Sequence, residues 1–446
     1  MANLTDRQRF PEQPVRGLYI WHVTRGNGAS RGMTLPHGVQ GAADPNFACA
    51  VRGFAGLFPH PRFGGGALSV YLDGEPVVDV WTGWSDRRGR RRWSADTAPM
   101  VFSATKGVAS TVIHRLVDRG LIDYDAPVAE YWPEFAANGK AEVTVFDVMR
   151  HRAGLSHLRG VRKRELLDHR HMEERIAAAP LGRHYGKSAY HALTYGWLLS
   201  GLARAVTGRG MRELMRMEVA APLNTDGIHL GRPPVGAPTR VAKIIGPQLN
   251  IPNPVFNAVA PAVAALELSA AFGSMYFPGA KGVVQRDIPL LDTELPSANG
   301  VITARALARM YGAMANGGMI DGERYLSAEL VASLTGRRSL RPDRNLIIPL
   351  AFHLGFHGLP IPGVLPGFGH VGLGGSFGWA IPEEGLAFSF VHNRLLTPLV
   401  ATDQAGFVGT GALVRLGAAA ARKRGFTPIA EFGAPYAFVQ AGIAAG

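Results

Sequence analysis

Hydrophobic residues form short β-like runs near both ends of the chain. Two such runs within residues 66–84 flank Asp73-Gly74, a dipeptide typical of tight hairpin turns. Two further runs lie at 377–382 and 386–393, on either side of a glycine-containing turn. These patterns predict one β-hairpin near each end of the chain.

Between these hairpins, apolar residues recur with the spacing of helices. Asp44-Pro45 is a helix start signal, and Thr144 is suited to cap a short helix. The predicted helices cover residues 45–58, 103–119, 143–151, 173–179, 192–206, 212–219, 304–316 and 410–422.

The order of these elements predicts an α+β fold. We expect a central antiparallel sheet built from both chain ends and flanked by helices, with an inserted, mostly helical lobe. The predicted parts are an irregular N-terminal extension (1–45), a sheet-containing α/β domain (46–125 and 340–446) and a mostly helical domain (126–339). Residues 246–261 and 338–369 are rich in loop formers, and long loops often carry a binding site.

The composition bears on the location of the protein and on the use of its cysteine. No apolar run in the 446 residues reaches the roughly 18 that a membrane span requires. The first ten residues lack the apolar segment of a secretory signal, so we expect a cytoplasmic protein without a membrane span. Cys49 is the only cysteine, which excludes an internal disulfide, and we expect it to be a small buried side chain.

The net charge of +13 raises the question of a nucleic-acid partner. Most of this charge is arginine, and the one dense cluster, Arg87–Arg92, lies between strand-like segments as a solvated loop would. Since no nucleic-acid-binding motif or basic helix face accompanies it, we expect no nucleic-acid partner.

Ser103 and Lys106 provide the first candidate chemistry. They are three residues apart at the predicted start of a helix, so their side chains share one face. A serine hydroxyl becomes a good nucleophile when a neighbouring base takes its proton. Lysine is such a base only if burial or a nearby cation lowers its pKa from about 10.4.

Tyr190 is a second candidate base, just ahead of the helix predicted from residue 192. A positive charge on Lys106 would lower the pKa of its phenol. An ordinary packing role is the alternative for Tyr190, and Tyr185 and Tyr195 are nearby competitors.

Three short motifs occur in order along the chain, namely Ser103-Ala104-Thr105-Lys106, Tyr190-His191-Ala192 and His370-Val371-Gly372. Together they resemble the serine β-lactamase and penicillin-binding-protein superfamily, in its class C-like form. Residues 143–155, 296–300 and 190–197 strengthen the resemblance, which is greatest to the family VIII carboxylesterases. The resemblance spans about residues 45 to 420.

The resemblance implies a role for each matching position. Ser103 would be acylated, while Lys106 and Tyr190 would share the acid and base work. The backbone amides of Ser103 and Leu373 would form the oxyanion pocket. His370, Gly372 and Gly374 would contact the substrate, and no metal or cofactor is implied.

Two positions depart from the lactamase pattern. Ala192 stands where the second motif usually has asparagine, and His370 stands where the third has lysine. Loss of a permanent cation at His370 disfavours a substrate carboxylate. Both changes favour a neutral ester over a β-lactam or a peptide.

Other features allow competing interpretations. Gly374-Gly375-Ser376-Phe377-Gly378 matches the nucleophile elbow of α/β-hydrolases, but Ser376 leads into a strand-like segment instead of a helix. Histidines 151, 157, 169, 171 and 184 form no zinc pattern, and we interpret them as surface or loop residues. Bulky residues that suit either a substrate pocket or the core are Trp197, Phe256, Phe272, Tyr276 and Phe356.

The sequence therefore predicts a serine carboxylesterase that acts on short-to-medium acyl esters through a Ser103 acyl-enzyme. An acyltransferase on the same site, a weak β-lactamase or peptidase, and a non-catalytic binding protein with the same fold are the alternatives. The expected partner is a small ester substrate. The sequence leaves the oligomeric state open, a homodimer included.

Overall fold

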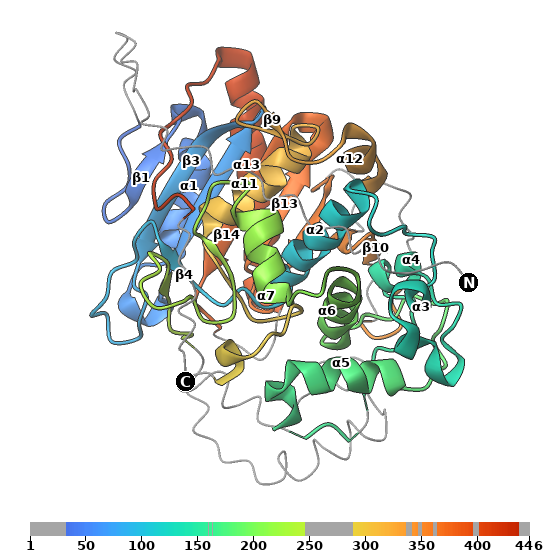
Figure 1. The fold of residues 1–446 in the computed structure, drawn as a ribbon. Helices are drawn as coiled ribbons and strands as arrows, with labels where there is room; N and C mark the ends of the chain where they lie inside the picture. Colours follow the sequence, from blue (N-terminus) through green and yellow to red (C-terminus); the bar gives the residue numbers. More distant parts are fainter. Residues whose placement is uncertain are drawn as a thin grey trace. The chain divides into compact units, whose positions relative to one another are not determined.

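An eight-stranded antiparallel sheet organises the structure, a computed structural model that describes residues 33–158, 160–162, 164–245, 289–335, 341–346, 350–359, 364–395 and 401–436 (Figure 1). In spatial order its strands are β1 (Gln40–Ala43), β3 (Glu75–Gly83), β2 (Gly65–Leu72), β14 (Leu386–His392), β13 (Phe377–Ile381), β12 (Phe368–Val371), β11 (Phe356–Gly358) and β10 (Ala351–His353). Strands β2 and β14 pair along their whole length, with Leu72 opposite Leu386 and Gly66 opposite His392. The prediction of a sheet built from both chain ends is confirmed.

The turn between β2 and β3 has the backbone that its sequence predicts. Asp73 and Gly74 have φ values of 51° and 84°. Positive φ at both central residues is the mark of a type I′ turn, whose twist matches that of a hairpin. The second predicted hairpin is also present, as β13 and β14.

Side chains alternate across the sheet and bury both of its faces. Leu68, Val70 and Leu72 of β2 point to one face, where α1 (Ala48–Gly56) and α13 (Ala401–Arg424) pack. Tyr71 points to the other face, which α11 (Ala304–Ala315) covers, as Figure 1 shows. Burial of each such Val, Leu or Phe side chain contributes roughly 1.5–3 kcal/mol relative to exposure.

The helices predicted along the middle of the chain are present. They are α2 (Thr105–Asp118), α4 (Val145–Met149), α5 (His169–Ala178), α6 (Thr194–Thr207) and α7 (Met211–Leu214) with a π turn (Met215–Ala220). Two further helices, α3 (Val128–Tyr131) and α12 (Ala328–Leu334), were not predicted. Thr144 caps α4 in a reciprocal capping box with Asp147. Helices α5 and α6 pack on each other and lie away from the large sheet in Figure 1.

Short strand pairs within the described middle region were not predicted. They are β4 (Thr97–Ala98) with β6 (Arg240–Val241), β5 (Ile228–Leu230) with β7 (Gly300–Ile302), and β8 (Met319–Ile320) with β9 (Glu323–Arg324). Helix α11 also packs on the large sheet, although it lies within the predicted helical domain. All the described residues belong to one compact unit, so the domain boundaries stay predictions.

Three other expectations differ from the structure. Residues 40–43 of the predicted irregular extension form β1, because their backbone pairs with the edge of β3. Strands β10 and β11 lie in a stretch expected to be loop-rich, where their shortness hid any alternation. Cys49 is exposed, because α1 buries Ala50, Val51 and Phe54 on its opposite side.

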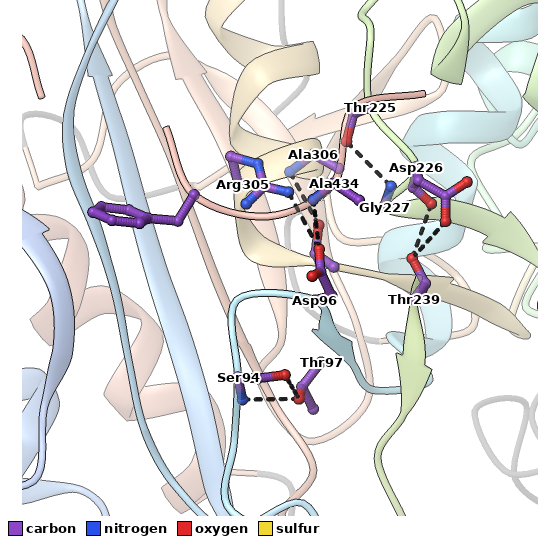
Figure 2. Close-up of polar contacts among 12 residues, drawn as sticks. Ser94, Asp96, Thr97, Thr225, Asp226, Gly227, Thr239, Arg305, Ala306 and Ala434 are labelled. Atoms are coloured by element: carbon purple, nitrogen blue, oxygen red, sulfur yellow. Dashed lines mark hydrogen bonds and ion pairs between the residues drawn. The ribbon is translucent and has the colours of Figure 1, made fainter. Parts of the chain in front are cut away.

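The chain closes over the sheet with a segment that we name the C-terminal strap, residues 425–436. Three of its backbone amides donate to carboxylates, with Thr427 bound to Asp44 (3.0 Å), Phe432 to Asp79 (3.2 Å) and Ala434 to Asp96 (2.7 Å). Arg305 lies beside Asp79 and Asp96, at 3.7 and 3.9 Å, and Figure 2 shows it with Asp96 and Ala434. Burial raises the pKa of the Asp79 carboxyl to about 6, although Arg305 and the Phe432 amide oppose the shift.

No helix in the described ranges is both long and apolar enough to cross a membrane.

Candidate active site

Ser103 lies in a 3-10 turn, Phe102–Ala104, that leads directly into α2. Phe102 has φ of 48°, a left-handed conformation that is rare for a bulky residue and is held by the surrounding structure. The hydroxyl of Thr105 donates to the Phe102 carbonyl (2.6 Å) and accepts from the Gly300 amide (2.9 Å). The first residue of β7 (Gly300–Ile302) therefore holds the turn that presents Ser103.

Lys106 lies one turn further along α2, and its side chain is fully buried. Its Nζ lies 3.2 Å from Ser103 Oγ, 2.7 Å from the Ala192 carbonyl oxygen and 2.8 Å from the Ser297 carbonyl oxygen. Burial lowers the pKa of Lys106 well below its ordinary value. A neutral amine has two N–H groups and one lone pair, so it can donate to both carbonyls and accept from the hydroxyl of Ser103.

Tyr190 contributes its phenol from the other side. Lys106 Nζ lies 5.0 Å from the centroid of the Tyr190 ring. Burial raises the pKa of Tyr190, and a hydrogen bond with Ser103 offsets only part of that rise. The expected lowering of this pKa by Lys106 is therefore wrong, because Lys106 is itself driven towards its neutral form.

The end of β12 lies against the Ser103 turn. A Cβ atom on Gly372 would come within 2.1 Å of the Val101 carbonyl oxygen, so only glycine fits there. Gly374 and Gly375 have φ of 92° and 102°, which turns the chain back towards β13. Leu373, which the sequence predicts to supply an oxyanion amide, directly follows Gly372 and is 39% exposed.

His370 is buried on β12, and its Nδ1 lies 3.0 Å from the Val371 carbonyl oxygen. Burial lowers the pKa of His370 well below its ordinary value, and His357 and Lys106 act in the same direction. The ring is therefore neutral where lactamases are expected to carry a cation.

His151 lies in a turn after α4, as a loop residue would, but it is buried beside Tyr190 and is not a surface residue. Its ring centroid lies 5.0 Å from that of Tyr190 and 4.4 Å from that of Phe352. His151 Nδ1 accepts from the His191 amide (3.1 Å), and burial lowers the pKa of the ring well below its ordinary value. His151 therefore packs against Tyr190 as an uncharged ring.

The family sequence pattern described as "Beta-lactamase" matches residues 50–408. The chain belongs to the beta-lactamase family. This membership and the geometry confirm the predicted β-lactamase-like fold and the resemblance on which it was based.

The chain is also similar to proteins of known name or structure. It is 67% identical over 409 residues to the esterase/beta-lactamase LipL of Mycobacterium tuberculosis (strain ATCC 25618 / H37Rv), which covers 92% of this chain and 95% of LipL. A solved family VIII carboxylesterase is 31% identical, with a TM-score of 0.71 over 85% of this chain and 99% of its own. A penicillin-binding-protein homologue from Caulobacter crescentus is 30% identical, with the same TM-score and coverage.

Several predicted residues lie elsewhere than at the site. Trp197 and Phe356 are fully buried core residues and do not line an open pocket. Phe256, Phe272 and Tyr276 lie outside the described residues. Ser376 ends the turn before β13 and is not followed by a helix, so the nucleophile-elbow context is absent there. No group of three potential metal-binding side chains occurs in the described ranges.

Asp343, Asn345 and Phe352 are site residues that the sequence did not reveal. Asp343 and Asn345 are buried and bind the backbone of Tyr190, and the Phe352 ring stacks on Tyr190 at 5.2 Å. The only signal was their place in the loop-rich stretch 338–369, where Asp-x-Asn is also typical of an ordinary turn.

Proposed function

We propose that this protein is a serine carboxylesterase that hydrolyses short-to-medium acyl esters through an acyl-enzyme on Ser103. The observation that carries this proposal is the buried Lys106 amine, 3.2 Å from Ser103 Oγ and bound to two carbonyls. A buried amine next to a serine hydroxyl can take its proton, and a serine is activated for nucleophilic attack by such an adjacent base.

In the proposed reaction, Lys106 accepts the Ser103 proton while Oγ attacks the ester carbonyl. The amides of Ser103 and Leu373 stabilise the negative oxygen of the tetrahedral intermediate. Tyr190, whose raised pKa keeps it protonated, passes a proton to the departing alcohol oxygen as the C–O bond breaks, and regains one from Lys106. Water then attacks the acyl-enzyme by the same route in reverse, releasing the carboxylic acid and Ser103.

The preference for a neutral ester rests on His370 and Ala192. His370 is buried and neutral, so it offers no cation to a substrate carboxylate. Ala192 offers no side-chain amide, and its carbonyl oxygen is occupied by Lys106. Absence of nucleic-acid partners and a cytoplasmic location stay predictions from the sequence.

The test is covalent labelling of the intact protein. A fluorophosphonate should add one adduct, and peptide mass spectrometry should find it on Ser103. Hydrolysis of p-nitrophenyl butyrate should fall in parallel with labelling. An adduct on Ser376, or full activity of the labelled protein, would overturn the proposal.

Hydrolysis of β-lactams is a second candidate function, favoured by the 67% identity to a relative named esterase/beta-lactamase. The two departures at Ala192 and His370 lead us to expect it to be the weaker activity. The ratio of β-lactamase to esterase activity is measured by the turnover of a chromogenic cephalosporin and of p-nitrophenyl butyrate on the same preparation. Transfer of the acyl group to added alcohols would in the same way reveal acyltransferase activity.

A further inference from the structure

Tyr190 lies in a stretch with no regular secondary structure. Residues 185–193 precede α6 and belong to no helix or strand. A phenol that exchanges protons with Ser103 needs a fixed position, because displacement by about 1 Å can cost a hundredfold in rate. Something other than local structure must hold this backbone.

The carboxylate of Asp343 lies directly behind Tyr190 and is 1% exposed. Its Oδ1 accepts from the Tyr190 amide at 3.0 Å, although the two residues are 153 positions apart. The same oxygen accepts from the amides of Asn345 (2.9 Å) and Leu346 (3.1 Å). Its Oδ2 accepts from the hydroxyl of Ser188 at 2.8 Å. Four donors therefore satisfy a buried carboxylate and fix its orientation.

Asn345 binds the backbone carbonyl group of Tyr190. It is fully buried, and its Nδ2 donates to the Tyr190 carbonyl oxygen at 2.9 Å. The Arg344 amide donates to the Ser188 carbonyl oxygen at 3.0 Å. Both backbone polar groups of Tyr190 are therefore bound by side chains of residues 343–345.

The ring of Tyr190 is fixed from the same part of the chain. Phe352 stacks on it, with ring centroids 5.2 Å apart and planes inclined by 14°. Leu346 and Leu350 pack against the same small cluster. The segment that grips the backbone thus continues into residues that confine the side chain.

We propose that Asp343 and Asn345 are positioning residues, which act through Tyr190 by fixing its phenol against Ser103. This inference rests on the proposed function, because it assigns Tyr190 a part in proton transfer. We name these two side chains, Asp343 and Asn345, the Tyr190 clamp. The inference predicts that damage to the clamp lowers kcat and leaves KM nearly unchanged, since neither side chain touches Ser103 or Lys106 in the described contacts.

Four variants test the clamp on p-nitrophenyl butyrate. We expect Asp343→Ala and Asn345→Ala to lower kcat about 10- to 100-fold, with KM within about threefold of the parent. Asp343→Asn keeps a carbonyl oxygen for the three amides and should retain kcat within about fivefold. Asp292→Ala, at an exposed carboxylate, is the matched control and should leave kcat unchanged. Circular dichroism melting identifies any variant that fails to fold, and Asn345→Ala then stands in for Asp343→Ala.

A double-mutant cycle separates positioning from general damage. In a Tyr190→Phe background, Asp343→Ala should cause no further loss of kcat beyond about threefold, because the group that it positions is already absent. A further loss of tenfold or more in that background would overturn the proposal. So would parental kcat in folded Asp343→Ala and Asn345→Ala.

Ser103→Ala, measured beside these variants, distinguishes the two proposals. If Ser103→Ala keeps esterase activity, the proposed function itself fails. If Ser103→Ala is inactive while the clamp variants match the parent, only the positioning role fails.

Discussion

Ser103 and Ser376 both occur in sequence patterns of serine hydrolases, yet their surroundings differ. Ser103 is partly exposed and lies 3.2 Å from a buried amine. Ser376 is buried, and among the described residues its Oγ binds the backbone of His392, accepting from the amide at 3.2 Å and donating to the carbonyl oxygen at 3.4 Å. A serine without a base within reach stays a weak nucleophile. The comparison teaches that the neighbouring base, and not the pattern of glycines, distinguishes the two sites.

Removal of the Ser103 hydroxyl tests most directly whether Ser103, and not Ser376, is the nucleophile. We expect Ser103→Ala to lower kcat for p-nitrophenyl butyrate by about 10⁴-fold or more, because the acyl-enzyme cannot form. Steady-state kinetics and fluorophosphonate labelling measure the loss. Residual activity within tenfold of the parent would mean that another residue is acylated.

Lys106→Met replaces the base with an apolar side chain of similar length. We expect kcat to fall about 10³-fold, within the range for loss of a general base. The exposed Lys187, changed to Met, is the control and should leave kcat unchanged. A comparable loss in both variants would point to a general charge effect.

Gly372→Ala tests the close contact between Gly372 and the turn that carries Ser103. The Gly372 amide donates to the Ser376 carbonyl oxygen, and an added Cβ would press on the Val101 carbonyl oxygen. We expect kcat to fall about 10- to 100-fold, because the Ser103 and Leu373 amides would be pushed apart. Gly56→Ala, where a Cβ meets open space, should have no effect, and equal losses in both would contradict this explanation.

The pH dependence of activity tests whether the base beside Ser103 is neutral in the free enzyme. Lys106 acts as a base only when neutral, and burial lowers its pKa well below the ordinary value. Activity should therefore fall about tenfold per pH unit below the Lys106 pKa, as the amine gains a proton, and this limb should lie well below the ordinary pKa of lysine. Initial rates in a series of buffers measure this limb. A rate that rises only near the ordinary lysine pKa would show that Lys106 is charged in the free enzyme.

Ser376→Ala should have the smallest effect. Its hydroxyl accepts one backbone amide between β13 and β14, so we expect a loss of stability of about 1 kcal/mol and a kcat within threefold of the parent. Thermal melting and steady-state kinetics check these values. A loss of activity as large as that of Ser103→Ala would reverse the assignment of the nucleophile.

The sequence predicts best what is close along the chain. The hairpin at Asp73-Gly74 and the Ser103–Lys106 pair depend on neighbours within four residues, and both are present as predicted. The clamp at Asp343 joins positions 153 residues apart, so no local pattern announces it. The ionisation of Tyr190 was misjudged for a related reason, because burial is set by the whole fold and outweighed the single cation that the sequence suggested.

The C-terminal strap has a consequence for folding kinetics. Asp44 and Asp79 lie at the start of the described chain, yet each receives a backbone donor from residues 427–432. During synthesis these two hydrogen bonds can form only after nearly the whole chain has been made. Contacts of such long sequence separation form slowly. We therefore expect docking of the strap to be a late folding step. Refolding of chains that end before residue 427 should lack this late step.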